Sequence, residues 1–197
     1  MKNDLSKERF RNEWKYLIST SEKEVLNLRM KPLMKLDPHA ENGGYLIRSL
    51  YFDDYYDRCL MENEAGTDPR EKFRIRIYNH SAERISLELK RKVRGKTQKI
   101  SCPLTEEQCR MLMAGQTPEI TKGTPPLLNK LVMLMKTTLM QPKVIVEYDR
   151  VPYIYPLGNV RVTLDENIRG GSRVDLFLED QIPLRPVSYT HLTLPTT

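Results

Sequence analysis

The chain has 197 residues, of which 39% are hydrophobic and 29% charged, with a formal net charge of +6. Such a composition is typical of one or two folded domains with a real core, and it excludes a disordered chain. No apolar run approaches the roughly 20 residues that span a bilayer, and the N-terminus lacks an apolar signal segment, so we expect a cytoplasmic protein without a transmembrane segment.

The N-terminal part of the chain predicts a strand followed by a helix. Residues 11–19 alternate charged side chains with apolar or polar ones, which is typical of a strand with one charged face. Ser19 to Ser21 can cap a helix that runs to about Met34, with acidic residues in its first turn. Pro32 should kink or restart this helix, because proline lacks the backbone N–H that a helix interior uses.

A second strand and a short helix come next. A loop at residues 37–44 leads to a strand predicted at 45–52. Residues 53–66 predict a short helix that ends near Gly66.

The segment 72–92 contains two alternating runs, KFRIRIYN and ISLELKRK, which predict a β-hairpin with one apolar and one charged face. We expect Arg74 to face Lys90 across this hairpin. Arg76 would then face Glu88, and the two charged faces would coincide. Like charges that lie opposite one another destabilise a strand pair, so either solvent dilutes the repulsion or a polyanion requires the cations.

Basic character is concentrated on this hairpin and on the residues that follow it. The stretch from Arg70 to Lys99 holds eleven cations and three acidic residues, so the rest of the chain is slightly acidic. Such a local concentration favours an anionic ligand over charge that only keeps the protein soluble.

The remaining elements complete one domain. Residues 93–96 predict a turn before a strand at 97–104, and Thr105 with Gln108 makes a capping box for a helix to about Ala114.

A helix and a second hairpin follow. Thr124 and Pro125 mark the start of a helix whose stripe of leucine and methionine predicts core packing. Residues 143–155 and 159–168 predict two strands joined by a turn at 156–158. No internal repeat or linker is visible, so we expect one α+β domain dominated by antiparallel strands.

Seven cations stand at alternating positions of the predicted strands: Lys15, Arg74, Arg76, Lys90, Lys99, Arg150 and Arg161. A closed antiparallel barrel would bring one polar face of every strand to a common interior. Cations within about 10 Å of one another would repel there unless a counter-charge were present. An extended phosphate chain would supply it, since arginine suits bidentate contacts with phosphate and lysine acts as a point charge.

Five motifs occur in a consistent order over about residues 10–180: EWKYLIS, DPHAENGGYLIRSLYFDD, REKFRIRIYN, LELKRK and VRVTLDENIR. Together they resemble the VTC domain, the polyphosphate-polymerase branch of the CYTH-like, or triphosphate tunnel metalloenzyme, superfamily, and most closely its bacterial members. The resemblance implies an antiparallel β-barrel that forms a basic tunnel with flanking helices.

The resemblance also implies an activity. A polyphosphate polymerase transfers the γ-phosphoryl group of ATP to a growing polyphosphate chain, releases ADP and uses a divalent metal, Mn²⁺ or Mg²⁺. ATP and inorganic polyphosphate would then be the partners, and a membrane partner in the cell stays open. We expect no nucleic-acid partner, because the strands lack the interleaved aromatic residues that stack bases.

The site residues follow from their places in the motifs of the family. Lys15 in EWKY matches the phosphate-binding lysine of the first strand. Arg74 and Arg76 in RIR match the paired arginines, and Lys90 in LELK matches the lysine of the next strand.

Three later cations complete the expected substrate-binding set. Lys99 is our choice for the following lysine, with Lys96 as the alternative, and Arg150 in EYDR and Arg161 in VRVTLD match two later arginines. Four of the seven are expected to act in catalysis: Arg74, Arg76, Lys90 and Arg161.

Two departures from the superfamily pattern concern the metal, whose ligands stay unassigned. The first-strand motif E-x-E-x-K retains only Glu13 of its two acids, because Arg11 replaces the other. An expected later strand of E-V-K type is also missing. We therefore expect residues 1–185 to be a truncated domain that lacks its last strand, and 186–197 to be a non-native tail. VSYTHLTLPTT resembles translated vector sequence, although its alternation would also suit a strand, and a foreign tail could leave this chain inactive.

Two further functions stay open: a triphosphatase or polyphosphatase that acts in the same tunnel, and a non-catalytic module that binds polyphosphate or inositol phosphates. Phosphoryl transfer requires positioning and charge stabilisation and no protein nucleophile, and the sequence offers no convincing one. For Glu88, Glu147 and Asp165, pairing with neighbouring cations is favoured over metal binding.

Overall fold

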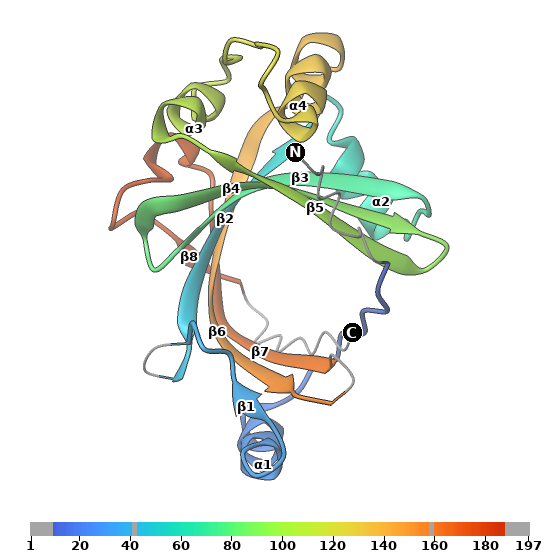
Figure 1. Cartoon of the computed structure of the whole chain (residues 1–197), viewed down its shortest axis with the longest axis vertical. Coiled ribbons are helices and arrows are strands. Elements are labelled where there is room, and N and C mark those ends of the chain that lie inside the picture. Colours follow the sequence, from blue (N-terminus) through green and yellow to red (C-terminus); the bar gives the residue numbers. More distant parts are fainter. Residues whose placement is uncertain (1–9, 41–42, 158–159, 188–197) are drawn as a thin grey trace. The chain divides into compact units, whose positions relative to one another are not determined.

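The computed structural model describes residues 10–40, 43–157 and 160–187 and has an α+β fold (Figure 1). The helices are α1 (Thr20–Met30), α2 (Arg58–Glu64), α3 (Glu106–Met113) and α4 (Pro126–Thr137), with a 3-10 helix at Val174–Leu176. The strands are β1 (Lys35–Leu36), β2 (Tyr45–Asp53), β3 (Arg70–Tyr78), β4 (Ser81–Val93), β5 (Lys96–Leu104), β6 (Gln141–Tyr155), β7 (Val160–Gly171) and β8 (Arg185–Pro186).

The strands form one mostly antiparallel sheet. Its hydrogen-bonded order is β5-β4-β3-β2-β6-β7-β8, and β1 pairs with β6. Within the described ranges this order begins at β5 and ends at β8 without returning to β5, so the ladder is not closed. The sequence predicts an α+β fold with flanking helices and an antiparallel barrel that lacks its last strand, and the structure confirms an α+β fold with a mostly antiparallel sheet that is not closed.

The chain is organised as two compact units. Of the described residues, the first unit contains 10–12, 50–76 and 83–143, and the second contains 13–40, 43–49, 77–82, 144–157 and 160–187. The candidate residues divide between them. Those of the first unit are Arg74, Arg76, Lys90 and Lys99, and those of the second are Lys15, Arg150 and Arg161.

The predicted first strand at residues 11–19 is wrong. Only Arg11 forms a bridge, with Thr97, through two backbone hydrogen bonds of 2.8 Å. The rest of the segment forms neither strand nor helix, and Trp14 and Tyr16 are exposed. Alternation describes a side-chain pattern, but a strand also needs a neighbouring backbone to bond with.

Helix α1 confirms its predicted start. The Ser19 hydroxyl accepts a hydrogen bond from the N–H of Glu22, whose carboxylate accepts one from the Ser19 N–H, which is a capping box. The helix ends at Met30, ahead of the expected end, because Pro32 lies in the turn that follows. Met30 packs in a small core with Tyr153 and Leu164.

Helix α2 is shorter than predicted because two aspartates hold the chain ahead of it. The Asp53 carboxylate accepts hydrogen bonds from the N–H groups of Cys59 and Leu60, and Asp54 accepts one from the N–H of Arg58. These bonds fix the turn that leads into the helix.

Helices α3 and α4 follow β5 in the chain. Thr105 and Gln108 form the predicted capping box of α3, so this prediction is confirmed. Helix α4 packs against β5 with its predicted apolar stripe buried. Its cap is Pro125 and not Thr124, because the Thr124 hydroxyl instead accepts a hydrogen bond from the N–H of Thr121.

The two hairpins of the basic region have tight turns. Asn79 and His80 join β3 to β4 with φ angles of 49° and 57°, and Arg94 and Gly95 join β4 to β5 with 51° and 76°. Two consecutive left-handed residues are typical of a two-residue hairpin turn. Asp68 fixes the second turn by accepting hydrogen bonds from both of its N–H groups, at 2.8 and 2.6 Å. The strands predicted at 45–52, 97–104, 143–155 and 159–168 are also confirmed, as β2, β5, β6 and β7.

Candidate functional site

Three cations of the first unit converge on one buried carboxylate. The side chain of Glu88, on β4, is 2% exposed and lies 2.7 Å from Arg74, 3.5 Å from Arg76 and 2.5 Å from Lys99. Arg74 and Arg76 occupy alternate positions of β3, and Lys99 lies on the neighbouring strand β5. These four residues are called the Glu88 cluster below.

The cluster holds Glu88 in its ionised form. Burial has the largest single effect on the pKa of Glu88 and raises it, because a charge is poorly solvated away from water. The combined attraction of Arg74, Arg76 and Lys99 outweighs burial and lowers the pKa to about 2. A single ionised carboxylate shared by three cations leaves the cluster itself with a net positive charge.

Two further side chains adjoin the cluster. Lys90, on β4, lies directly opposite Lys99 in the β4–β5 ladder and is half-buried. Like charges in that position repel, and the carboxylate of Glu88, which contacts Lys99, offsets part of this repulsion. Tyr51, on β2, accepts a hydrogen bond of 3.0 Å from Arg74, whose guanidinium carbon lies 5.8 Å from the ring centroid.

Exposure differs sharply within the cluster. The side chains of Lys99 and Arg74 are 49% and 15% exposed, whereas that of Arg76 is 6% exposed. An anion that arrives from solvent therefore meets Lys99 and Arg74 first, with Arg76 behind them.

In the second unit, the two candidate arginines each bind a different aspartate. Arg150, on β6, donates two hydrogen bonds of 2.6 Å to Asp165, which faces it across the β6–β7 ladder. Arg161, on β7, donates to Asp37 at 2.6 Å and to the hydroxyl of Tyr45 at 2.8 Å. Arg150 and Arg161 thus contact different aspartates, whereas three cations share the carboxylate of Glu88.

Burial affects both of these pairs. It lowers the pKa of Arg150, but the nearby Tyr148 and the bonds to Asp165 more than reverse this and raise it. At Asp37, burial raises the pKa, and hydrogen bonds from His39 together with Arg161 lower it overall. Asp37 and Arg150 are therefore charged at neutral pH.

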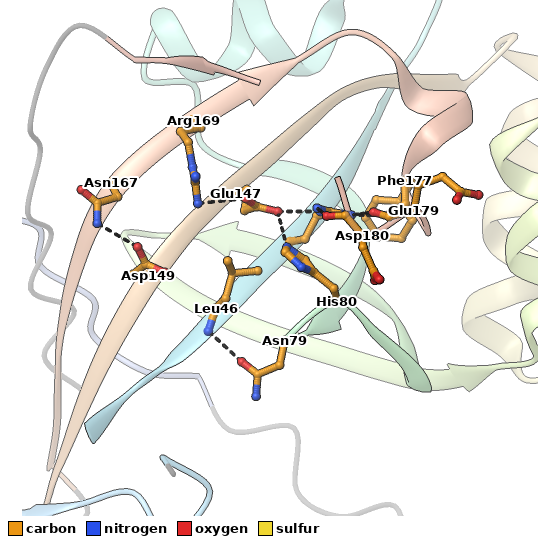
Figure 2. A network of polar contacts seen from close by, with 11 residues as sticks. Leu46, Asn79, His80, Glu147, Asp149, Asn167, Arg169, Phe177, Glu179 and Asp180 are labelled. Atoms are coloured by element: carbon orange, nitrogen blue, oxygen red, sulfur yellow. Dashed lines mark hydrogen bonds and ion pairs between the residues drawn. The ribbon is translucent and has the colours of Figure 1, made fainter. Parts of the chain in front are cut away.

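In the second unit, the buried carboxylate of Glu147 is the centre of a network of polar contacts that the sequence did not predict (Figure 2). Glu147 accepts hydrogen bonds from Arg48 at 2.6 Å, and its carboxylate lies 2.9 Å from the ring nitrogen of His80 and 3.0 Å from Arg169. The Arg48 side chain is 1% exposed. It also donates to the backbone carbonyls of three residues downstream: Phe177, Glu179 and Asp180. The network fixes the segment after β7. The sequence signal for it was a single arginine within the mostly apolar strand β2.

The structure brings together only part of the predicted site. Arg74, Arg76 and Lys99 meet at Glu88, and Lys99 rather than Lys96 occupies this position. Arg150 and Arg161 lie with their aspartates in the second unit. Lys15 is exposed on a segment outside any strand, so its predicted place on a strand face is wrong.

The acidic residues pair with cations, as predicted: Glu88 with the cluster, Glu147 with Arg48 and Arg169, and Asp165 with Arg150. Among the described residues, no three side chains of histidine, cysteine, aspartate or glutamate are grouped to hold a metal ion. The carboxylates of Glu88, Glu147 and Asp165 already accept bonds from neighbouring cations, so these three residues do not fit a metal site. Within the same ranges, no helix has the length and apolar character needed to cross a membrane.

A family model described as the VTC domain matches residues 10–193. Curated proteins give no sequence match. Residues 186–193 of the expected non-native tail fall within the family match, while 188–197 lie outside the described residues. The assignment of a non-native tail stays a prediction.

Two solved structures share the fold. A candidate adenylate cyclase from Bacillus halodurans aligns with a TM-score of 0.56 and 12% identity, over 93% of this chain and 78% of that chain. A candidate adenylyl cyclase from Hippeastrum, described as having a dominant triphosphatase activity, aligns with a TM-score of 0.50 and 15% identity, over 93% and 77%. At these identities the likeness concerns the fold alone.

Proposed function

This chain belongs to the VTC domain family, and from that membership we propose that it is a polyphosphate polymerase that transfers the γ-phosphoryl group of ATP to a growing polyphosphate chain. The observation that carries the proposal is the Glu88 cluster, in which three cations from neighbouring strands share one carboxylate. A cluster with more cations than carboxylates suits a chain of phosphates, because phosphate oxygens are strong hydrogen-bond partners for guanidinium and ammonium groups.

The proposed reaction does not require a covalent intermediate with the protein. Phosphoryl transfer is catalysed mainly by positioning the reactants and by stabilising the charge on the transferring group. Arg74, whose planar guanidinium can bind two phosphate oxygens at once, and Lys99, as a point charge, are the residues that an incoming phosphate reaches. Arg76 and Lys90 add positive charge to the same face. We assign Arg74 and Lys99 to direct contacts with the phosphates nearest the reacting bond, and Arg76 and Lys90 to stabilising the charge on those phosphates.

The cations of the second unit are proposed to contribute to substrate binding. Arg150 and Arg161 would bind phosphate oxygens in competition with their aspartates, and Arg161 retains the catalytic assignment that its motif implies. Lys15 would bind phosphate from its exposed segment. A divalent metal would supply charge neutralisation to the phosphates, but no described residue is proposed as its ligand.

A hydrolase that cleaves triphosphate or polyphosphate is the second candidate function. It is favoured by the triphosphatase activity attributed to the Hippeastrum protein, which has the same fold. The same cations would serve either reaction, because both stabilise charge on a transferring phosphoryl group and differ in whether a phosphate or water accepts it. A module that binds polyphosphate without turnover is the third.

One assay separates the three functions. The full-length protein is incubated with γ-labelled ATP, Mn²⁺ or Mg²⁺ and short polyphosphate, and the products are resolved by size. Label in lengthening chains supports the polymerase. Label released as free phosphate without chain growth supports the hydrolase, and binding without turnover supports the module. Arg74→Gln should abolish the turnover, whereas Arg110→Gln, an exposed arginine of α3 paired with Glu106, should not.

A further inference from the structure

Glu88 occupies hydrogen-bonding positions of both Arg74 and Lys99. One carboxylate oxygen, Oε2, accepts hydrogen bonds from Arg74, and the other, Oε1, lies 2.5 Å from the amine of Lys99. Carboxylate and phosphate oxygens are equivalent partners for a guanidinium and an ammonium group. The cluster is therefore already bound to an internal anion.

The hydrogen-bonding edges of Arg74 are both in use. Its Nε and Nη2 atoms lie 2.8 and 2.7 Å from Oε2 of Glu88. Its third nitrogen, Nη1, donates to the hydroxyl of Tyr51 at 3.0 Å. A phosphate can bind Arg74 through the Nε–Nη2 edge only by replacing Glu88.

From these contacts we propose that Glu88 is a built-in counter-ion, which a phosphate group of the substrate displaces from Arg74 and Lys99. This inference rests on the proposed function, since it assumes that the cluster binds phosphate. Glu88 would act as a positioning residue that keeps the cations in place before substrate binds, and it would compete with substrate for them.

Arg76 can keep its contact with the carboxylate of Glu88 after a phosphate has displaced that carboxylate from Arg74 and Lys99. It lies 3.5 Å from Glu88 and its side chain is 6% exposed, so an incoming phosphate does not compete for it as it does for Arg74 and Lys99. The Glu88–Arg76 contact can persist while the other two are exchanged. Glu88 therefore does not become an unpaired buried charge, which would be strongly destabilising.

Competition between Glu88 and phosphate for Arg74 and Lys99 would determine how tightly the substrate is bound and how readily it is released. An enzyme that moves along or releases a polyanion benefits if each phosphate contact is opposed by an internal anion. Removing the charge of Glu88 should therefore tighten binding, which is the opposite of what the loss of a structural or ligand-binding residue does.

The test measures binding of tripolyphosphate to the full-length protein by calorimetry near neutral pH and at fixed salt. We expect Glu88→Gln to lower Kd by about tenfold, the effect of removing one competing charge-assisted interaction. The matched control is Glu71→Gln. Glu71 lies on β3 and pairs with Lys130 and Arg91, away from the cluster, so its loss should leave Kd unchanged.

Equal or weaker binding by Glu88→Gln would overturn the inference while leaving the proposed function intact. Absence of binding in the unmodified protein would overturn the proposed function itself, and the inference with it. If Glu88→Gln does not fold, a crystal structure of the unmodified protein with tripolyphosphate decides the matter. Phosphate oxygens should then occupy the Nε–Nη2 edge of Arg74, and a Glu88 that keeps this edge would refute the proposal.

Discussion

Replacing Arg74 by glutamine tests the role of the Glu88 cluster in binding. Arg74 makes two contacts with Glu88, at 2.7 and 2.8 Å, and one with Tyr51. Glutamine keeps a polar but shorter side chain and removes the charge and the planar guanidinium group. The variant should fold, because Glu88 retains Lys99 and Arg76 as partners.

The expected loss of affinity for tripolyphosphate follows from the hydrogen bonds that Arg74 exchanges between Glu88 and phosphate. A hydrogen bond to a charged group contributes about 1.5–3 kcal/mol, which corresponds to a factor of roughly 10 to 150 in Kd. In this cluster, the bonds to phosphate replace bonds to Glu88, so the net loss lies at the lower end. We expect Arg74→Gln to raise Kd for tripolyphosphate by about tenfold. The dependence of binding on salt should also become weaker, because one cation fewer is screened.

Calorimetric titration of the two proteins at several salt concentrations measures both effects. Arg110→Gln serves as the control, because Arg110 is an exposed arginine of the same unit that pairs with Glu106. Thermal unfolding of both variants checks that the fold is intact. If the folded Arg74→Gln variant binds tripolyphosphate as the unmodified protein does, or if Arg110→Gln loses as much affinity, Arg74 is not a specific phosphate ligand.

Three other outcomes are expected. Because the pKa of Glu88 is lowered from 4.5 to about 2, its ion pairs stabilise the fold fully above pH 4.5 and less as the pH falls toward 2. Glu88→Gln should flatten that part of the curve of unfolding free energy against pH, and an unchanged curve would contradict the ion pairs. Arg48→Met leaves the buried Glu147 without its shortest partner and should lower the free energy of unfolding by about 3–5 kcal/mol, as measured by urea denaturation; a change below about 1 kcal/mol would contradict the network. Thr105→Ala removes half of the capping box with Gln108 and should lower the same quantity by about 1 kcal/mol, and no loss would show that the cap is dispensable.

The features that the sequence predicts well are local. The capping box of Thr105 and Gln108 lies within four consecutive positions, and the turn after β4 depends on adjacent residues with left-handed backbone. The alternation of Arg74 and Arg76 also places both on one strand face, which is why they could be assigned to one site. In each case the signal is a spacing that one element imposes.

The features that it predicts poorly depend on distant partners. Arg48 bonds with Glu147 and with carbonyls of the segment after β7, and none of these is near it in the chain. Lys15 lies in a segment with the alternation of a strand, but a strand forms only where a neighbouring backbone accepts its hydrogen bonds. The difference between a shared carboxylate at Glu88 and the separate pair of Arg150 with Asp165 likewise appears only in three dimensions.

The most direct test of the proposed polymerase is a comparison of its two products. The full-length protein is supplied with ATP, divalent metal and polyphosphate, and the ADP released is measured together with the phosphate added to the chains. A polymerase releases one ADP for each phosphate that enters a chain. Release of ADP with an equal amount of free phosphate, and with no lengthening of the chains, would contradict the proposal.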